Sequence, residues 1–338
     1  MHDRNIILKA HTNLFSQIIS LDNLLTSWRE FRNGKRSKYD VIVFERNLED
    51  NLFQLNHELK TKIYHHSDYI AFYITDPKRR HIHEAEVRDR IVHHAVYRIL
   101  YPIFGRRFIY DSYSCRLRRG THKAVKRLKL FTRKISANYT KPCFALKCDI
   151  KKFFDSVDHN ILFQLIKKKI NDPDTLSLIW EILSSFERER ERERESKGIP
   201  LGNLTSQLFA NIYLNELDQF IKHKLKIKHY LSYADDFVIL GNNRNDLKKL
   251  IPVFGQFLQV KLKLQLHPDK IFIRKLKQRI DFCGYVVLPH YTVLRTKTKR
   301  RMLKRANPNN LPSYLGLLKH CAGYKLERKI IAHLTQKV

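Results

Sequence analysis

Acidic residues are scarce in this chain of 338 residues, which has 33 Asp and Glu against 65 Lys and Arg and a formal net charge of +32. Such an excess destabilises a compact fold by self-repulsion unless a polyanion shares the field, so we expect a nucleic acid or an anionic membrane as partner. Hydrophobic residues still make up 43% of the chain. A chain of that composition buries a substantial core, which excludes disorder as its overall state.

Paired cysteines and long apolar runs are missing as well. The five cysteines are scattered and never in CxxC spacing, which excludes a disulfide framework and a zinc ribbon. No apolar run approaches the roughly 20 residues that cross a bilayer, and the first five residues lack the pattern of a signal peptide. We therefore expect a cytoplasmic protein without a membrane segment.

Histidine is abundant, with 17 residues, and a metal site is the first alternative to consider. His81, His83, His93 and His94 lie close together in the sequence, but their surroundings are basic and no Cys or carboxylate completes a tetrahedral set. We expect these four to be ordinary surface or RNA-facing histidines.

Apolar periodicity predicts an α+β chain without internal repeats or long linkers. Four leucines between positions 48 and 59 recur at helical spacing, and a second helix is expected at about 84–103. Residues 144–149 are typical of a short buried strand. A hairpin is predicted further on, with strands at 230–233 and 237–240 and two aspartates at its turn.

One tract of low complexity, Glu187–Glu195, alternates Glu and Arg without a break. A helix there would place like charges four residues apart, and a strand would have one acidic and one basic face. We expect a solvated loop or hairpin, with docking of a partner as the alternative.

In so basic a chain, the informative residues are acids at apolar positions. Asp149 ends the strand at 144–149, and Asp235 and Asp236 lie between the strands of the hairpin. Unpaired buried carboxylates cost several kcal/mol, so either Lys or Arg partners or divalent cations must neutralise them. Adjacent strands would bring these acids within reach of a pair of Mg²⁺ ions, the arrangement used in phosphoryl transfer.

The segments around these acids resemble the motifs of reverse transcriptases. Tyr233–Asp236 resembles the YxDD box of that family, and Asp149–His159 resembles its first metal-binding motif. Gly198–Leu214 is similar to the motif that contacts template and dNTP, and Phe282–Tyr285 is similar to the primer grip. The similarity extends upstream through two further segments, Arg88–Ala95 and Arg116–Ala124.

The resemblance covers roughly residues 20–330. It implies a right-hand polymerase of α+β class, with fingers, a ferredoxin-like antiparallel palm and a short helical thumb. The regions it implies are an N-terminal helical extension at 1–60, fingers at 61–140 with 160–197 contributing, a palm at 141–159 and 198–289, and a thumb at 290–338.

The activity implied is attack of a primer 3′-OH on the α-phosphate of a dNTP. By resemblance, Asp149 and Asp235 would hold two Mg²⁺ ions, Asp236 would support the site, and the backbone carbonyl of Ile150 would complete the ligands of one ion. Lys270 is a further candidate, as the donor of a proton to pyrophosphate. Asp155 and Asp158 are instead expected to open a helix.

Further roles follow from the matched motifs. The residues implied to bind the dNTP are Lys78, Arg80, Phe154, as the steric gate, and Leu201. Support of the template motifs is implied for Arg116, Gly202, Ser206, Gln207 and Tyr233. The primer grip would comprise Phe282, Gly284 and Tyr285. A basic nucleic-acid track for template RNA and the RNA–DNA hybrid would comprise Lys123, Lys126, Arg127, Arg300 and Arg301.

The branch of the family is indicated by the middle motif. Group II intron enzymes usually read Pro-Gln-Gly and Ser-Pro there, whereas this chain has Leu201 in place of the Gln and Gln207 after Ser206. The Gly-Asn-x-x-Ser-Gln version resembles the reverse transcriptases of diversity-generating retroelements, which are bacterial or phage-encoded and misincorporate opposite adenines. That resemblance also implies a small, basic, oligomeric accessory protein, and we expect no maturase, endonuclease or RNase H domain.

Two alternatives remain. The same chemistry could serve a group II intron-like or defence-associated reverse transcriptase, or the chain could be a catalytically idle RNA-binding scaffold with a polymerase fold. The Ser206-Gln207 pair argues against the intron-like enzyme, and the three intact aspartates argue against the idle scaffold.

Overall fold

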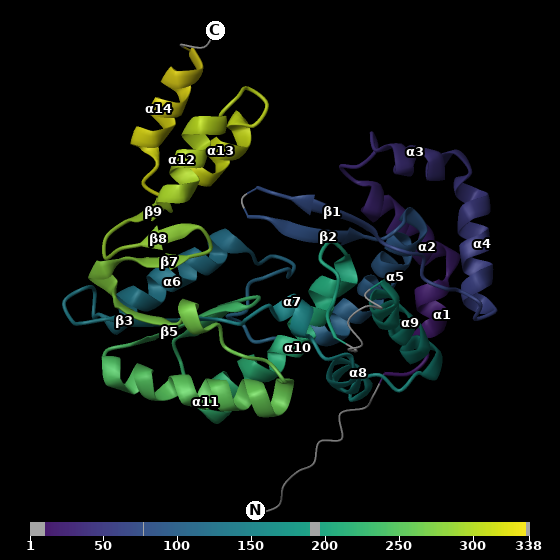
Figure 1. The fold of residues 1–338 in the computed structure, drawn as a ribbon, viewed down its shortest axis with the longest axis horizontal. Coiled ribbons are helices and arrows are strands. Elements are labelled where there is room, and N and C mark those ends of the chain that lie inside the picture. Colours follow the sequence, from purple (N-terminus) through teal and green to yellow (C-terminus); the bar gives the residue numbers. More distant parts are fainter. Residues whose placement is uncertain (1–10, 77, 190–196, 336–338) are drawn as a thin grey trace, which may run out of the picture. The chain divides into compact units, whose positions relative to one another are not determined.

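The computed structural model describes residues 11–76, 78–189 and 197–335, and its chain divides into two compact units (Figure 1). Unit 1 comprises the described residues of Met1–Phe108, Lys152–Glu216 and Gln259–Leu264. Unit 2 comprises those of Ile109–Lys151, Leu217–Leu258 and Gln265–Val338. Two helices continue from one unit into the other, α10 (Leu204–Gln219) and α11 (Arg244–Leu262).

Unit 1 is mainly helical. Its other helices are α1 (Phe15–Ile19), α2 (Leu21–Arg32), α3 (Tyr39–Arg46), α4 (Leu48–Lys60), α5 (Val87–Gly105), α7 (Phe153–Ser156), α8 (His159–Lys167) and α9 (Pro173–Glu189). The predicted leucine stripe lies on α4, where Leu52, Leu55 and Leu59 are buried and Leu48 is half-buried. The helix expected at 84–103 begins at Val87 instead, because Glu84 pairs with Ile70 in the antiparallel hairpin of β1 (Ile70–Ile74) and β2 (Arg80–Glu84).

Unit 2 is built on a four-stranded antiparallel sheet with strand order β4-β5-β3-β6. The strands are β3 (Phe144–Asp149), β4 (Tyr230–Tyr233), β5 (Asp236–Gly241) and β6 (Phe272–Lys275). Alternation along each strand separates two faces. Val238 and its neighbours on one face share a core with helix α6 (Thr121–Ile135), whereas Phe237 on the other face contacts Phe254 of α11.

A second antiparallel sheet and three helices complete unit 2. The strands are β7 (Ile280–Phe282), β8 (Tyr285–Val287) and β9 (Thr292–Leu294), and the helices are α12 (Thr296–Arg305), α13 (Leu311–Leu318) and α14 (Tyr324–Thr335). Short helical turns lie at Phe220–Lys224, Pro268–Lys270 and Leu276–Gln278. Met302, Leu318 and Ile330 from the three helices belong to the same buried cluster as Tyr285 and Leu294, so these helices are part of the core of unit 2.

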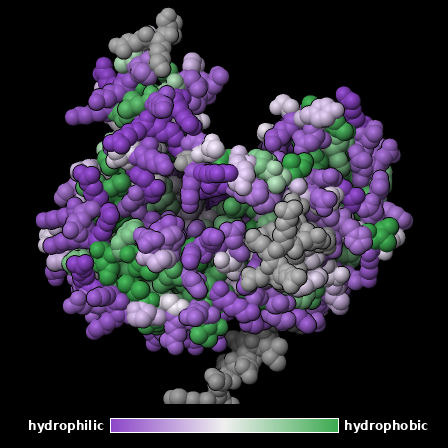
Figure 2. All heavy atoms as spheres, in the orientation of Figure 1, coloured by the Kyte–Doolittle hydropathy of each residue, from purple (hydrophilic) through white to green (hydrophobic). Residues whose placement is uncertain are grey.

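The predicted α+β class with antiparallel sheets is therefore confirmed. The boundaries expected for fingers, palm and thumb stay a prediction. The loop or hairpin expected for the Glu/Arg tract is wrong for Glu187–Glu189, which continue α9, and the rest of the tract lies outside the described residues. Hydrophilic residues cover most of the face shown in Figure 2. None of the helices described is both long and apolar enough to cross a bilayer.

Candidate active site

The three candidate aspartates meet at one end of the four-stranded sheet in unit 2. Asp149 is the last residue of β3, and its Cα partner on the neighbouring strand is Asp236. Tyr233 pairs with Asp236 across the β4–β5 hairpin, which leaves Ala234 and Asp235 as the two loop residues. The strand ladder therefore brings Asp149 together with the adjacent Asp235 and Asp236, although Asp149 precedes Asp235 by 86 positions in the sequence.

The hairpin turn differs in one detail from the prediction, which placed both aspartates at the turn. Asp236 is the first residue of β5, so that only Asp235 lies in the loop. Ala234 has a φ of 50°, in the left-handed region that a residue with a Cβ rarely adopts. The backbone of Asp235 is tied to β3, because Ile150 N donates a 3.1 Å hydrogen bond to Asp235 O. Strain of this kind is typical of functional sites.

Burial and the closeness of the carboxylates both disfavour negative charge at this end of the sheet. Burial and then the neighbouring Asp149 and Asp236 raise the pKa of Asp235 to about 6. Burial also raises the pKa of Asp236, although Lys147 opposes that shift. The arrangement disfavours three simultaneous negative charges unless cations lie close by.

Two lysines supply part of the missing positive charge. Lys270 Nζ lies 2.8 Å from Asp149 Oδ1, and Lys147 Nζ lies 3.1 Å from Asp236 Oδ2. The other carboxylate oxygen of Asp236, Oδ1, is buried and has no hydrogen-bond partner among the described residues. Lysine partners therefore neutralise part of the charge of these acids. They leave one buried carboxylate oxygen, Asp236 Oδ1, without a hydrogen-bond donor among the described residues.

The donor set fits Mg²⁺ better than it fits a structural metal. Within the described ranges, no group of three or more His, Cys, Asp or Glu side chains, the three aspartates included, could by itself hold a metal ion. Mg²⁺ does not need such a group, because it binds proteins through one or two carboxylates and keeps waters or substrate phosphates as its other ligands. The unpartnered Asp236 Oδ1 and the raised pKa of Asp235 are both features that a bound cation would relieve.

The residues expected to bind the dNTP lie in unit 1. Lys78 and Arg80 are exposed on the β1–β2 hairpin, where Arg80 is the first residue of β2; Pro77 lies outside the described residues. Phe154 is half-buried in α7, and its carbonyl accepts a 2.8 Å hydrogen bond from Ile199 N. That bond ties the turn carrying Phe154 to the segment that precedes Leu201.

Leu201 belongs to a loop that is fastened to β2. His83 N donates to Leu201 O at 3.0 Å, and Asn203 Nδ2 donates to His83 O at 3.0 Å. Gly202 has a φ of 126°, and a Cβ at this position would lie 3.1 Å from Ile82 Cγ2. Only glycine suits both the conformation and the close approach. Within unit 1, the loop that carries Leu201 is therefore hydrogen-bonded to β2, the strand that begins with Arg80.

The motif-support residues fall into three groups. Ser206 is buried, while Gln207 beside it is exposed. Arg116 donates from one Nη to Ile109 O at 2.6 Å and to Ser112 O at 2.9 Å, so it holds a loop together. Tyr233 accepts a 3.2 Å hydrogen bond from Thr121 Oγ1 at the start of α6.

The residues expected to form the primer grip lie in a tight hairpin of unit 2. Phe282 and Tyr285 pair as the ends of β7 and β8, and both side chains are buried in the core. Cys283 and Gly284 between them have φ values of 49° and 82°, as a two-residue hairpin turn requires. What this segment presents to the outside is therefore its turn rather than its two aromatic rings.

The five residues expected to form a nucleic-acid track differ in their exposure to solvent. Lys123, Lys126 and Arg300 are exposed. Arg301 is half-buried. Arg127 forms an ion pair with the buried Asp111 at 2.7 Å from its Nε, so its charge is already matched inside the protein.

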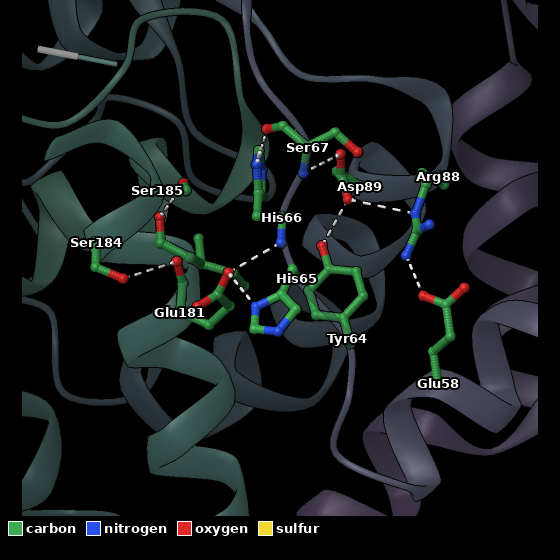
Figure 3. A network of polar contacts seen from close by, with 11 residues as sticks. Glu58, Tyr64, His65, His66, Ser67, Arg88, Asp89, Glu181, Ser184 and Ser185 are labelled. Carbon is green, nitrogen blue, oxygen red and sulfur yellow. Dashed lines mark hydrogen bonds and ion pairs between the residues drawn. The ribbon is translucent and has the colours of Figure 1, made fainter. Parts of the chain in front are cut away.

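Several buried polar residues were not anticipated from the sequence. Asp218 of α10 accepts hydrogen bonds from Tyr230 and Ser232, and burial raises its pKa to about 6. In the sequence, the buried role of Asp218 is indicated only by the position of an acid within the apolar pattern of α10. Asp89 in unit 1 accepts a 2.7 Å hydrogen bond from Tyr64 OH and one from Ser67 N at 3.2 Å (Figure 3).

His93 corrects the prediction made for the histidines. It is 1% exposed, and its Nε2 lies 3.1 Å from His66 Nε2, while its Nδ1 contacts Thr205 Oγ1. Burial lowers the pKa of His93 well below its usual value, so this ring is a neutral core group rather than a surface or RNA-facing one. The packing of α5 against the start of α10 overrides the polarity of the side chain.

The sequence matches a known family along most of its length. Residues 75–287 match the profile of the family described as reverse transcriptase (RNA-dependent DNA polymerase). Protein YkfC of Escherichia coli (strain K12) is 26% identical over 232 residues, which cover 59% of this chain and 60% of YkfC. Group II intron-encoded protein LtrA of Lactococcus lactis subsp. cremoris is 25% identical over 303 residues, which cover 70% of this chain and 49% of LtrA.

The chain thus spans only about half to three fifths of the length of these relatives. Among solved structures, apo telomerase from Candida tropicalis superposes with a TM-score of 0.54 at 14% identity, over 76% of this chain and 52% of that one. A likeness at so low an identity concerns the fold alone. It confirms the right-hand polymerase fold expected from the sequence.

Proposed function

The chain belongs to the reverse transcriptase family, and we propose that it is an RNA-directed DNA polymerase that copies a template RNA into cDNA. The observation that carries this proposal is the convergence of Asp149, Asp235 and Asp236 at the end of the palm-type sheet, with a buried oxygen left unpartnered. A purely structural cluster of acids would instead have a partner for each oxygen.

In this proposal, Asp149, Asp235, Asp236 and the Ile150 carbonyl hold two Mg²⁺ ions, which would neutralise charge on the triphosphate and on the attacking and leaving oxygens. The protein itself contributes position and charge. The Ile150 N–H fixes the backbone of Asp235, and the β3–β5 ladder fixes Asp149 opposite Asp236. Lys270, already 2.8 Å from Asp149, is a candidate to donate a proton to pyrophosphate.

We propose that residues of unit 1 contact the dNTP. Arg80, with Lys78, would contact the triphosphate through charge-assisted hydrogen bonds. Phe154 would exclude a ribose 2′-OH by its bulk. Leu201 would contact the base region with an aliphatic side chain, which offers no hydrogen bond to check base geometry, so base selection would depend on shape.

We further propose that the chain serves a diversity-generating retroelement and misincorporates opposite adenine. This finer proposal is supported by Leu201 and by Gln207 after Ser206. A small, basic, oligomeric accessory protein would be its partner. The alternative is a group II intron-like enzyme, which is favoured by the 25% identity to LtrA over 70% of the chain.

Primer extension on an RNA template with Mg²⁺ tests the activity. The wild type should synthesise cDNA and Asp235→Ala should not; absence of synthesis by the wild type with any template or partner would contradict the proposal. Sequencing of the cDNA tests the finer proposal. Leu201→Gln should lower errors opposite adenine, and an unchanged error spectrum would contradict the role of Leu201.

A further inference from the structure

Unit 2 contains a pocket of about 670 Å³. Asp149, Asp235 and Asp236 are not among its described lining residues. Its walls come from α6, from the turn between β8 and β9, and from the loop between α13 and α14, all of which can be followed in Figure 1. Sites for nucleotide-sized ligands have volumes in this range. The roles predicted above include Lys123, Lys126 and Tyr285 of this lining, but they do not include its histidines or Tyr291.

The pocket has an uncompensated positive charge. Lys123, Lys126 and Lys129 of α6 line it, and none of its described lining residues is acidic. In the part of the chain that the structure describes, none of these three lysines forms an ion pair; Lys123 Nζ donates to the backbone carbonyl of Arg118. Such a concave cationic surface attracts phosphate groups.

The same pocket contains flat aromatic surfaces. The rings of His122 and His320 stack with centroids 3.6 Å apart and an interplanar angle of 22°. Burial and then the neighbouring His320 lower the pKa of His122, so this ring is neutral at neutral pH and stacks without charge repulsion. Tyr291, which is 50% exposed, lines another wall.

The walls are held together by hydrogen bonds. Ala322 N donates to Thr292 O at 2.8 Å, and Tyr285 OH donates to Leu317 O at 3.0 Å. Gly323 follows directly, and a Cβ at this position would lie 2.8 Å from Leu318 Cβ. The loop that carries His320 is therefore positioned before any ligand arrives, which lowers the entropy lost on binding.

We propose that this pocket binds an unpaired stretch of RNA outside the primer–template duplex, so that Lys123 and Lys126 of the predicted track contact the single strand rather than the hybrid. Lysines contact phosphates whatever the sequence, while aromatic rings stack on bases that only an unpaired strand exposes. Both kinds of surface line the same pocket. The inference rests on the proposed function, because it takes the template to be RNA.

The test is binding of a fluorescent 12-residue polyuridine, followed by anisotropy without any synthesis. The double variant His320→Ala/Tyr291→Ala should bind it about tenfold more weakly, the loss expected when a stacking ring is removed. A matched control, His57→Ala/Tyr39→Ala on exposed helices of unit 1, should bind like the wild type. Lys129→Gln should reduce the slope of log affinity against log salt by about 0.7.

Extension of a preformed primer–template duplex separates this inference from the proposed function. The double variant should keep the KM for that duplex within about twofold of the wild type. Equal binding of polyuridine by the double variant and the control would overturn the inference. A tenfold rise in the KM for the duplex would also overturn it, because the pocket would then belong to the duplex site.

Discussion

Asp89 in unit 1 and Asp236 in unit 2 are both acids with buried oxygens, yet only Asp89 has a partner for each of them. Asp89 accepts hydrogen bonds from Tyr64 and Ser67 and has Arg88 beside it, as Figure 3 shows. Asp236 has Lys147 on one oxygen and no described partner on the other. Saturated hydrogen bonding identifies an acid that holds the fold, and unsaturated bonding identifies one that is available to a ligand.

Replacement of Asp89 should have the largest effect on stability. Asp89→Asn cannot accept from both Tyr64 OH and Ser67 N in the same way, and it removes the more distant of the two carboxylates beside Arg88, which keeps Glu58. We expect the free energy of unfolding to fall by about 3 kcal/mol, measured by urea denaturation. Asp68→Asn, an exposed neighbour, is the control and should change it by less than about 0.5 kcal/mol. Equal effects would remove the distinction between the two acids.

Asp235→Asn should do the opposite and stabilise the metal-free protein. Because the folded pKa of about 6 lies above the ordinary 3.8, the ionised carboxylate is disfavoured in the fold. That penalty grows between about pH 4 and pH 6 and is full above pH 6. We expect a gain of about 2 kcal/mol at pH 7 and none near pH 4, measured by unfolding in EDTA. A loss of stability at pH 7 would contradict the repulsion inferred for the three aspartates.

Activity should follow the same titration. At limiting Mg²⁺, kcat/KM for primer extension should fall about fivefold from pH 6 to pH 5 as Asp235, with its pKa of about 6, becomes protonated. Excess Mg²⁺ competes with the proton and should move the fall to lower pH. A profile that is flat between pH 5 and pH 7 at limiting Mg²⁺ would place the essential acid elsewhere.

The smallest effect is expected at Lys270, whose side chain is 42% exposed. Its ion pair with Asp149 is largely screened by water, so Lys270→Gln should lower the free energy of unfolding by only about 0.5 kcal/mol. Thermal denaturation at low and high salt measures this. A loss above about 2 kcal/mol would mean that the lysine is as structural as the partners of Asp89.

Much of the sheet that carries the aspartates could be predicted from the sequence. The strand ending at Asp149 has the predicted bounds, because a short and mostly apolar run ends there at a carboxylate. Asp158 caps α8 as expected, since its side chain accepts a hydrogen bond from Ile161 N. Local patterns of this kind need no knowledge of distant contacts.

Other features depend on contacts that local patterns do not contain. Sequence periodicity cannot reveal that Asn203 reaches His83, or that His93 is buried against His66, because these partners come from separate segments. Asp89 lies within a recognised motif, but its structural role follows only from Tyr64 and Ser67 folding over it. The same limit applies to the pocket between α6 and His320.

The most direct test of this account measures stability and activity on one sample of Asp235→Asn. The account predicts a higher unfolding midpoint than the wild type at pH 7 in EDTA. It also predicts primer extension on an RNA template with Mg²⁺ that is lower by about a thousandfold or more. A variant that extends primers within a few-fold of the wild type would contradict the claim that these aspartates form the polymerase active site.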